Sequence, residues 1–220
     1  MFLLVLALAL LIGAVLGLLG GGGSILTLPL LTYVGGVEPR GAIAASLFVV
    51  AVTSAVALVP HARAGRVRWR TGVLFGGAGM VGALIGGQLA PLLPVRVLLI
   101  AFAALMVVAA IAMLVGRRAR APLGGELPLG KVLALGVAVG VVVGTLGAGG
   151  GFVVVPALVL LGGLSMEAAV GTSLVVIAMQ SSAGLASHLR HVEMPWRVTL
   201  AVTAVAVCGR GAGGWPARRW

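Results

Sequence analysis

Long apolar runs constrain this chain more than any other feature of its sequence. An α-helix needs roughly 20 apolar residues to cross a bilayer. Stretches of about this length recur along the chain, the last one being short: 2–19, 42–60, 71–90, 95–115, 131–147, 168–187 and 198–209. Only 9% of the residues are charged, against roughly 25% in a soluble domain. The sequence therefore predicts an all-α, polytopic membrane protein.

Two further apolar stretches, 25–36 and 152–163, are too short to span as regular helices. Each follows a glycine cluster and contains a proline, Pro29 or Pro156. Consecutive glycines disfavour helix because glycine loses the most backbone entropy on ordering. We therefore expect a broken helix at each place, with both short stretches entering and leaving the membrane on one face.

An internal repeat organises the chain. Shifted by 127 positions, the sequence overlays itself without a gap from Gly17 to Arg70. The overlay matches residues that apolar composition alone does not align: Pro29 with Pro156, Ser46 with Ser173, His61 with His188, Arg63 with Arg190, and Trp69 with Trp196. The sequence thus contains two copies of one unit.

The net charge of +11 comes from 15 Lys and Arg residues against 4 acidic residues. The cations lie in short loops between apolar runs, which favours membrane topology and lipid headgroups over nucleic acid as their partner. Three Arg-rich loops, 61–70, 116–131 and 188–197, are predicted to be cytoplasmic. Both repeats then have one orientation, with a pseudo-two-fold axis along the membrane normal. If either short stretch is a full span instead, the repeats are inverted, and the sequence leaves this choice open. The N-terminus is apolar from Phe2 onward and is expected to be a retained first helix with a cytoplasmic start.

The repeat also divides the chain. We expect a first transmembrane repeat at 1–115, a cytoplasmic linker at 116–130, an incomplete second repeat at 131–209, and an atypical tail at 210–220. Trp220 corresponds to position 93, so the second repeat has no counterpart of 95–115. A truncated or altered end explains this better than a functional tail.

The glycine clusters are the first candidate site. Non-helical backbone survives at membrane depth only where it is buried in protein or lines a cavity. The amides of a restarting helix favour an anion. The alternative is close helix packing, as in the spacing Gly136-xxx-Gly140-xxx-Gly144. For the matched pair we favour a substrate site, with these residues as candidates: Gly20, Gly22, Gly23, Ser24, Pro29, Gly147, Gly149, Gly150, Gly151 and Pro156.

Small polar side chains supply a second set of candidates. Ser46 and Ser54 share one helix face, and so do their repeat equivalents Ser173 and Ser181. Gln180 replaces Thr53 of the first repeat. Each could instead bond a neighbouring helix. We expect the substrate path to be lined by Ser46, Thr172, Ser173 and Gln180.

Other motifs point away from catalysis. The glycine clusters lack the Lys-Ser/Thr ending and flanking strand of a nucleotide-binding loop. The acids Glu38, Glu126, Glu167 and Glu193 lie in loops or at helix ends, which disfavours a carboxylate proton relay and hydrolytic chemistry. His61 and His188 are expected to be interfacial anchors rather than gates. Cys208 is the single cysteine. No catalytic residue, metal or cofactor is predicted.

The segments LLGGGGSILTLPLL, GTLGAGGGFVVVPALVLLGG and AAVGTSLVVI, with the duplicated halves, resemble the TauE/SafE family of sulfite exporters or anion permeases. The resemblance covers residue 1 to about 208. It implies export of small organosulfur anions across a bacterial inner membrane. The family's motif residues correspond here to Gly20, Gly22, Gly23 and Pro29, and to Gly147, Gly149, Gly150 and Pro156. The family usually has about eight helices, so the resemblance implies that this chain lacks a counterpart of the last one.

Together these features predict a multi-pass transporter, in a bacterial inner membrane, for a small anion such as sulfite or an organosulfonate. The anion would bind near the midplane between the two glycine breaks, and the halves would rock to give alternating access. The alternative is a membrane scaffold without transport, or an inactive fragment whose glycines only pack helices. The sequence leaves the substrate, the coupling ion and the oligomeric state open.

Overall fold

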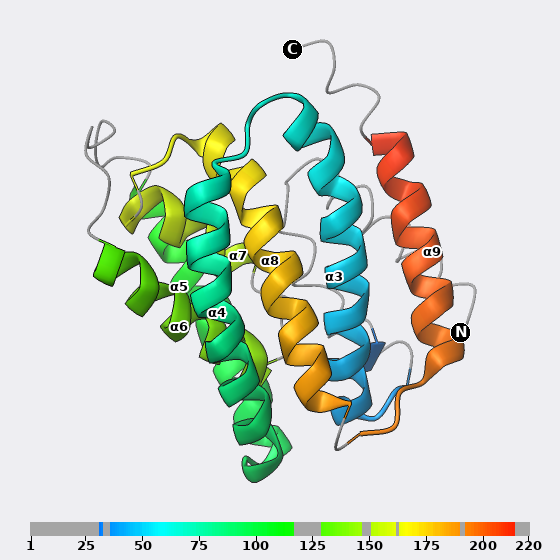
Figure 1. The fold of residues 1–220 in the computed structure, drawn as a ribbon. Coiled ribbons are helices and arrows are strands. Elements are labelled where there is room, and N and C mark those ends of the chain that lie inside the picture. Colours follow the sequence, from blue (N-terminus) through cyan, green and yellow to red (C-terminus); the bar gives the residue numbers. More distant parts are fainter. Residues whose placement is uncertain are drawn as a thin grey trace.

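The computed structural model describes residues 31–32, 36–116, 129–146, 151–161, 163–189 and 192–213, and these residues form helices and short connections without a strand. The long helices lie side by side in one bundle (Figure 1). Their bounds are α3 Pro39–Arg63, α4 Trp69–Leu89, α5 Val95–Gly116, α6 Leu129–Leu146, α8 Met166–His188 and α9 Trp196–Gly213. Short elements join them: η2 Ala90–Leu92 (3-10), α7 Gly151–Pro156 and η3 Ala157–Leu161 (π). The predicted all-α membrane fold is confirmed.

Most of these helices coincide with the apolar runs of the sequence. Among the described residues, four helices are long and apolar enough to cross a membrane, at 39–63, 69–92, 129–146 and 166–188. The α9 helix continues to Gly213, although the sequence predicted that its span would stop at 209. Residues 2–19, most of 25–36, most of the linker and 214–220 lie outside the described residues.

The two repeats fold alike. The α3 and α8 helices begin at equivalent positions, 39 and 166, and so do α4 and α9, at 69 and 196. Ser46 Oγ donates to Ile43 O at 2.8 Å, and Ser173 Oγ donates to the equivalent Val170 O at 2.8 Å. His61 and His188 each place Nδ1 about 3 Å from the carbonyl oxygen four residues earlier. The local sequence therefore dictates the same structure in both copies.

Glycine ends the short segment of each repeat. Gly36 has φ +63° and Gly163 has φ +59°, a conformation that only glycine adopts readily. The next residue's N–H reaches back six residues, from Val37 to Leu31 O at 3.0 Å and from Leu164 to Leu158 O at 3.2 Å. This bond reaches one residue further back than that of a Schellman cap, and it satisfies a carbonyl near the end of the short segment. Gly36 and Gly163 thus redirect the chain just before α3 and α8 begin.

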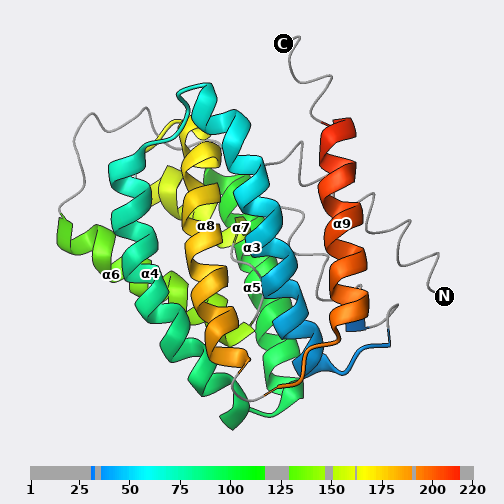
Figure 2. The same ribbon diagram turned by 45° about the vertical axis from the view of Figure 1, so that its right-hand side comes forward.

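The repeats are inverted, which contradicts the predicted common orientation. Leu47 of α3 packs on Gly184 of α8, while Gly171 near the start of α8 meets Arg66 O beyond the end of α3. Gly41 near the start of α3 meets Glu193 O beyond the end of α8. Equivalent helices are therefore antiparallel, and the connections at 64–68 and 192–195 lie at opposite ends of the bundle (Figures 1 and 2). We call these the Arg66 end and the Glu193 end.

The short segment of the second repeat explains why the two repeats are inverted. The α6 helix runs parallel to α4, because Gly136, Gly140 and Gly144 meet Phe75, Gly79 and Ala83 in order. It therefore ends toward the Glu193 end, whereas α8 begins at the Arg66 end. Residues 151–161 carry the chain back between them as a short helix that widens into a π-helical turn after Pro156. For 152–163 the predicted re-entry on one face is wrong, since this broken segment carries the chain from the Glu193 end toward the Arg66 end and reverses the second repeat. The equivalent stretch 25–36 lies mostly outside the described residues.

Glycines bring α4 and α6 into backbone contact. A Cβ on Gly140 or Gly144 would overlap the carbonyl of Gly79 or Ala83, and one on Gly82 would overlap Val137 O. Such approach permits Cα–H···O contacts between helices, which help to hold helices together where the hydrophobic effect does not act between them. The packing role expected for Gly136, Gly140 and Gly144 is confirmed. The glycines of α4 that face α6 were not predicted to pack there, although their three- and four-residue spacing is the same signal for close helix packing.

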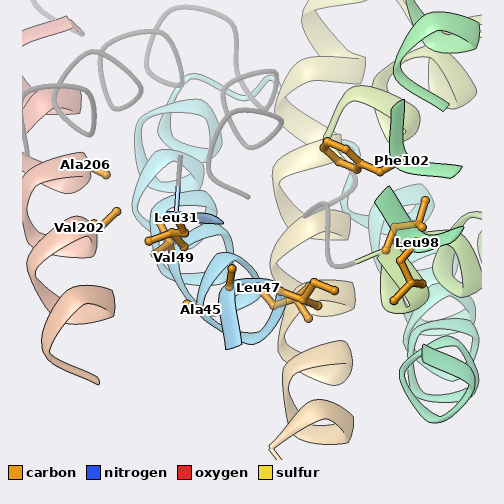
Figure 3. Close-up of a cluster of buried hydrophobic side chains, with 11 residues drawn as sticks. Leu31, Ala45, Leu47, Val49, Leu98, Phe102, Val202 and Ala206 are labelled. Carbon is orange, nitrogen blue, oxygen red and sulfur yellow. The ribbon is translucent and has the colours of Figure 1, made fainter. Parts of the chain in front are cut away.

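The remaining helices close around apolar side chains. One buried cluster joins α3, α5 and α9, with Leu47 and Val49 facing Leu98, Phe102, Val202 and Ala206 in its neighbours (Figure 3). A second cluster places Val154 and Leu158 of the short segment against α6 and α8. The short segment is thus enclosed by protein, as non-regular backbone in a membrane requires.

Candidate functional site

Gln180 lies at the centre of the bundle. It stands near the middle of α8, and its side chain packs directly on Gly79, the central residue of α4. Gly79 in turn contacts Gly140 of α6. Because Gly79 has no side chain, the amide of Gln180 occupies the space that a Cβ at this position would take.

The amide of Gln180 is buried without a partner. The residue is 0% exposed, and neither Nε2 nor Oε1 makes a hydrogen bond within the described part of the chain. Leaving a buried donor or acceptor unsatisfied costs about 1–3 kcal/mol. A native structure carries that cost only where something offsets it, such as an internal water, an ion or a ligand.

Two equivalent serines share this property. Ser54 Oγ and Ser181 Oγ are buried and have no hydrogen-bond partner among the described residues. The contact of Leu47 with Gly184 sets the register of α3 against α8. At 1.5 Å per residue, Ser54 then lies within about 5 Å of the depth of Gln180, and Ser181 lies within about 5 Å of the depth of Thr53. The sequence paired these serines through the repeat, but only their burial marks them as candidates.

The other predicted path residues are buried but lie apart. By the same register Ser46 and Ser173 are separated by about 18 Å along the bundle, on opposite sides of its middle. Thr172 Oγ1 accepts a hydrogen bond from Arg68 N at 3.0 Å, at the Arg66 end. These three residues therefore do not meet Gln180 at one point.

The structure describes only a few of the candidates from the two glycine segments. Gly20, Gly22, Gly23, Ser24, Pro29, Gly147, Gly149 and Gly150 lie outside the described residues. Gly151 begins α7, and Pro156 ends it in a buried position. Leu146, before this glycine segment, and Val154, after it, are both buried.

Charge is confined to the two ends. Every Arg, Lys or Glu within the described helices lies within four positions of a helix end. His188 is 4% exposed, with Nδ1 3.0 Å from Gly184 O, whereas its equivalent His61 is half-buried. Among the described residues, no three His, Cys, Asp or Glu side chains converge as metal ligands do. Neutral dipoles thus dominate the centre.

Comparison with known proteins agrees with this architecture. The family model described as sulfite exporter TauE/SafE matches residues 5–220. A probable membrane transporter protein of Xylella fastidiosa is 35% identical over 209 residues, covering 92% of this chain and 80% of the relative. The probable membrane transporter protein YdhB of Bacillus subtilis is 26% identical over 216 residues, covering 96% of this chain and 88% of the relative. No solved structure matches.

A bundle of apolar helices with an inverted repeat, a broken helix and buried polar groups at its centre is the architecture of a membrane transporter. The chain belongs to the sulfite exporter TauE/SafE family. Its resemblance to that family, inferred from the glycine-proline segments, is confirmed.

Proposed function

We propose that this protein exports a small anion, such as sulfite or an organosulfonate, by alternating access across a bacterial inner membrane. The buried, unpartnered amide of Gln180 carries the proposal. A primary amide offers two N–H donors, which are what the oxygens of a sulfite or sulfonate group accept. Anion binding would satisfy those donors.

Weak, neutral recognition suits a carrier. The centre of the described helices holds no charged side chain. An anion there would meet neutral donors, each contributing about 1 kcal/mol. Backbone amides at the glycine segments would add up to about 2 kcal/mol per helix end. The sum of a few such terms corresponds to millimolar to micromolar binding, so the anion can be released.

We propose that the glycine segments supply these amides, from Gly20, Gly22, Gly23 and Ser24 in the first repeat and from Gly147, Gly149, Gly150 and Gly151 in the second. Pro29 and Pro156 have no backbone N–H to donate, and would instead fix the course of the short segment after each break. The equivalent caps at Gly36 and Gly163 support the view that both segments are built alike. In an inverted repeat, equivalent segments approach one depth only near the midplane. That is where the substrate of such transporters binds.

The hydroxyls of Ser46, Ser173 and Thr172, which lie on opposite sides of Gln180, would then line the two halves of the substrate path. Ser46 lies toward the Glu193 end, and Ser173 with Thr172 lies toward the Arg66 end. We propose that each set lines the path on its own side of Gln180. The bond from Arg68 N to Thr172 would have to open whenever the path opens at the Arg66 end.

We propose that the Arg66 end is cytoplasmic. It gathers Arg63, Arg66, Arg68, Arg70 and Lys131 against Glu167, whereas the Glu193 end has Arg40, Arg96 and Arg197 against Glu38 and Glu193. Cytoplasmic ends carry the excess of Lys and Arg. The predicted cytoplasmic N-terminus lies outside the described residues. As the inverted counterpart of α6, residues 2–19 would instead begin at the outer face.

Uptake into proteoliposomes tests the proposal. The full chain, with sulfite, sulfate, sulfoacetate and taurine as probes, should accumulate at least one anion, and Gln180→Leu should reduce the rate at least tenfold. Ser182→Ala is the matched control, because Ser182 is an exposed residue of α8 that bonds its own helix at Ala178 O. A folded wild-type chain that moves none of these anions would favour the scaffold alternative. Full transport by Gln180→Leu would remove Gln180 from the site.

A further inference from the structure

The start of α3 has a cation where the start of α8 has an acid. Arg40 and Glu167 are repeat equivalents, each the second residue of its helix. The partial positive charge at a helix N-terminus favours an acid there and disfavours a cation. Glu167 follows this rule and Arg40 breaks it. Two copies of one unit thus differ in charge at one position, at opposite ends of the bundle.

Arg40 stands at a small cavity in the Glu193 end. The cavity has a volume of about 20 Å³, and its wall combines Arg40 and His188 with the apolar side chains Ile43, Ala90, Leu98 and Val192. A space of this size accepts one group about as large as a water molecule, which is also about the size of a methyl group. The cavity therefore offers a guanidinium beside a mostly apolar recess.

The guanidinium is available for a ligand. Its one hydrogen bond within the described residues runs from Nη2 to Pro91 O, at 3.4 Å. Glu38 and Glu193 belong to the same end, yet neither forms an ion pair with Arg40 in the described part of the chain. An exposed arginine that neutralises no acid presents several N–H donors in a fixed plane suited to oxyanions.

We propose that Arg40 and this cavity form a vestibule subsite for a small organic monoanion with a one- or two-carbon apolar body. The anionic head would lie on the guanidinium, and the alkyl group would enter the recess bounded by Ala90 and Leu98. The subsite rests on the proposed function for its place on the substrate path. It favours an alkyl sulfonate over inorganic sulfite, because sulfite has nothing to place in the recess.

Binding to the full chain in detergent tests this subsite apart from transport. Ethanesulfonate and sulfite are titrated while the melting temperature is followed, since a ligand of the folded state raises it. Arg40→Gln should weaken ethanesulfonate binding about three- to tenfold, and Arg40→Lys should recover part of it. Ala90→Leu, which fills the recess and keeps the charge, should weaken ethanesulfonate but leave sulfite unchanged. Arg96→Gln is the matched control, a cation at the same end that does not line the cavity.

The outcomes separate the two proposals. Gln180→Leu should slow transport at least tenfold but keep the part of ethanesulfonate binding that Arg40→Gln removes. If Arg40→Gln binds ethanesulfonate as the wild type does, or Arg96→Gln loses as much as Arg40→Gln, the subsite is overturned while transport stands. In that case Arg40 is an interfacial anchor for lipid headgroups. If the wild type binds neither anion, the subsite is overturned whatever the transport assay gives.

Discussion

The α3 and α8 helices are two copies of one sequence in different surroundings. Thr53 Oγ1 of α3 donates to Val49 O of its own helix at 2.7 Å, whereas Gln180, its equivalent in α8, has an amide with no partner among the described residues. The α3 helix packs on α8 and on the apolar side chains of α9. The α8 helix packs on α3 and on the glycine surface of α4.

If the proposed function holds, this difference is how a duplicated unit acquires a site. Both copies keep the same caps and the same serine bonds, because these depend on local sequence. They differ at the centre, where Thr satisfies itself and Gln does not. At this position the longer polar side chain of Gln180, lying over Gly79, has unsatisfied hydrogen-bonding groups in the second repeat only, whereas Ser54 and Ser181 are unpartnered in both repeats.

The comparison of α3 with α8 depends first on the inverted arrangement of the two repeats. Labelling from the two sides of the membrane tests this arrangement with an all-or-none outcome. On a Cys208→Ala background, Ala64→Cys and Glu193→Cys are both exposed and lie at opposite ends of the bundle. An impermeant thiol reagent should label one from the cytoplasm and the other only from outside. Labelling of both from one side would restore the parallel repeat and contradict the shared depth of Ser54 and Gln180.

The glycine surface behind Gln180 should be the next most sensitive feature. Gly140→Ala drives a methyl group into the backbone of Gly79, and overpacking at a rigid contact costs about 1–3 kcal/mol. Thermal unfolding in detergent should show this loss. The control is Gly77→Ala in α4, where the added Cβ meets nothing within 4 Å. It should keep or slightly raise stability, since Ala favours helix by about 1 kcal/mol. Equal melting temperatures for both variants would contradict the close α4–α6 contact.

Gln180→Leu should separate stability from function. Leucine removes two unsatisfied polar groups and keeps a side chain of similar size over Gly79, so unfolding should become harder by about 1–2 kcal/mol. Thermal unfolding measures this gain while transport is lost. Thr53→Val removes a hydroxyl that is already bonded, and should give no such gain. A Gln180→Leu protein less stable than wild type would mean that the amide has a structural partner.

Thr172→Val should have the smallest effect. It removes the acceptor for Arg68 N, and one such hydrogen bond contributes about 1 kcal/mol. Thr172→Ser keeps the hydroxyl and should retain the wild-type melting temperature. Loss of stability in both variants would assign the effect to packing against Gly72, which lies next to the Thr172 side chain.

The sequence by itself determined the class of fold, the helix positions and the repeat. Hydropathy locates spans because lipid requires about 20 apolar residues in each. The repeat appears in the glycine caps and the His and Ser positions, because these make local bonds. The packing role of Gly136, Gly140 and Gly144 was also readable, since four-residue spacing places small residues on one helix face.

Only the tertiary structure decided the orientation of the repeats and the residues at the centre. Residues 151–161 are too short for a regular span, and nothing in their composition says whether they re-enter or cross; their packing against α6 and α8 answers that. The number of Arg residues in each loop predicted the wrong orientation of the second repeat for the same reason. Such a count treats Arg66 and Arg197 alike, whereas the bundle places them at opposite ends. Gln180 was a candidate among several hydroxyls. It stands out because Gly79 of another helix, 101 positions away in the chain, lies beneath its side chain and offers it no hydrogen bond.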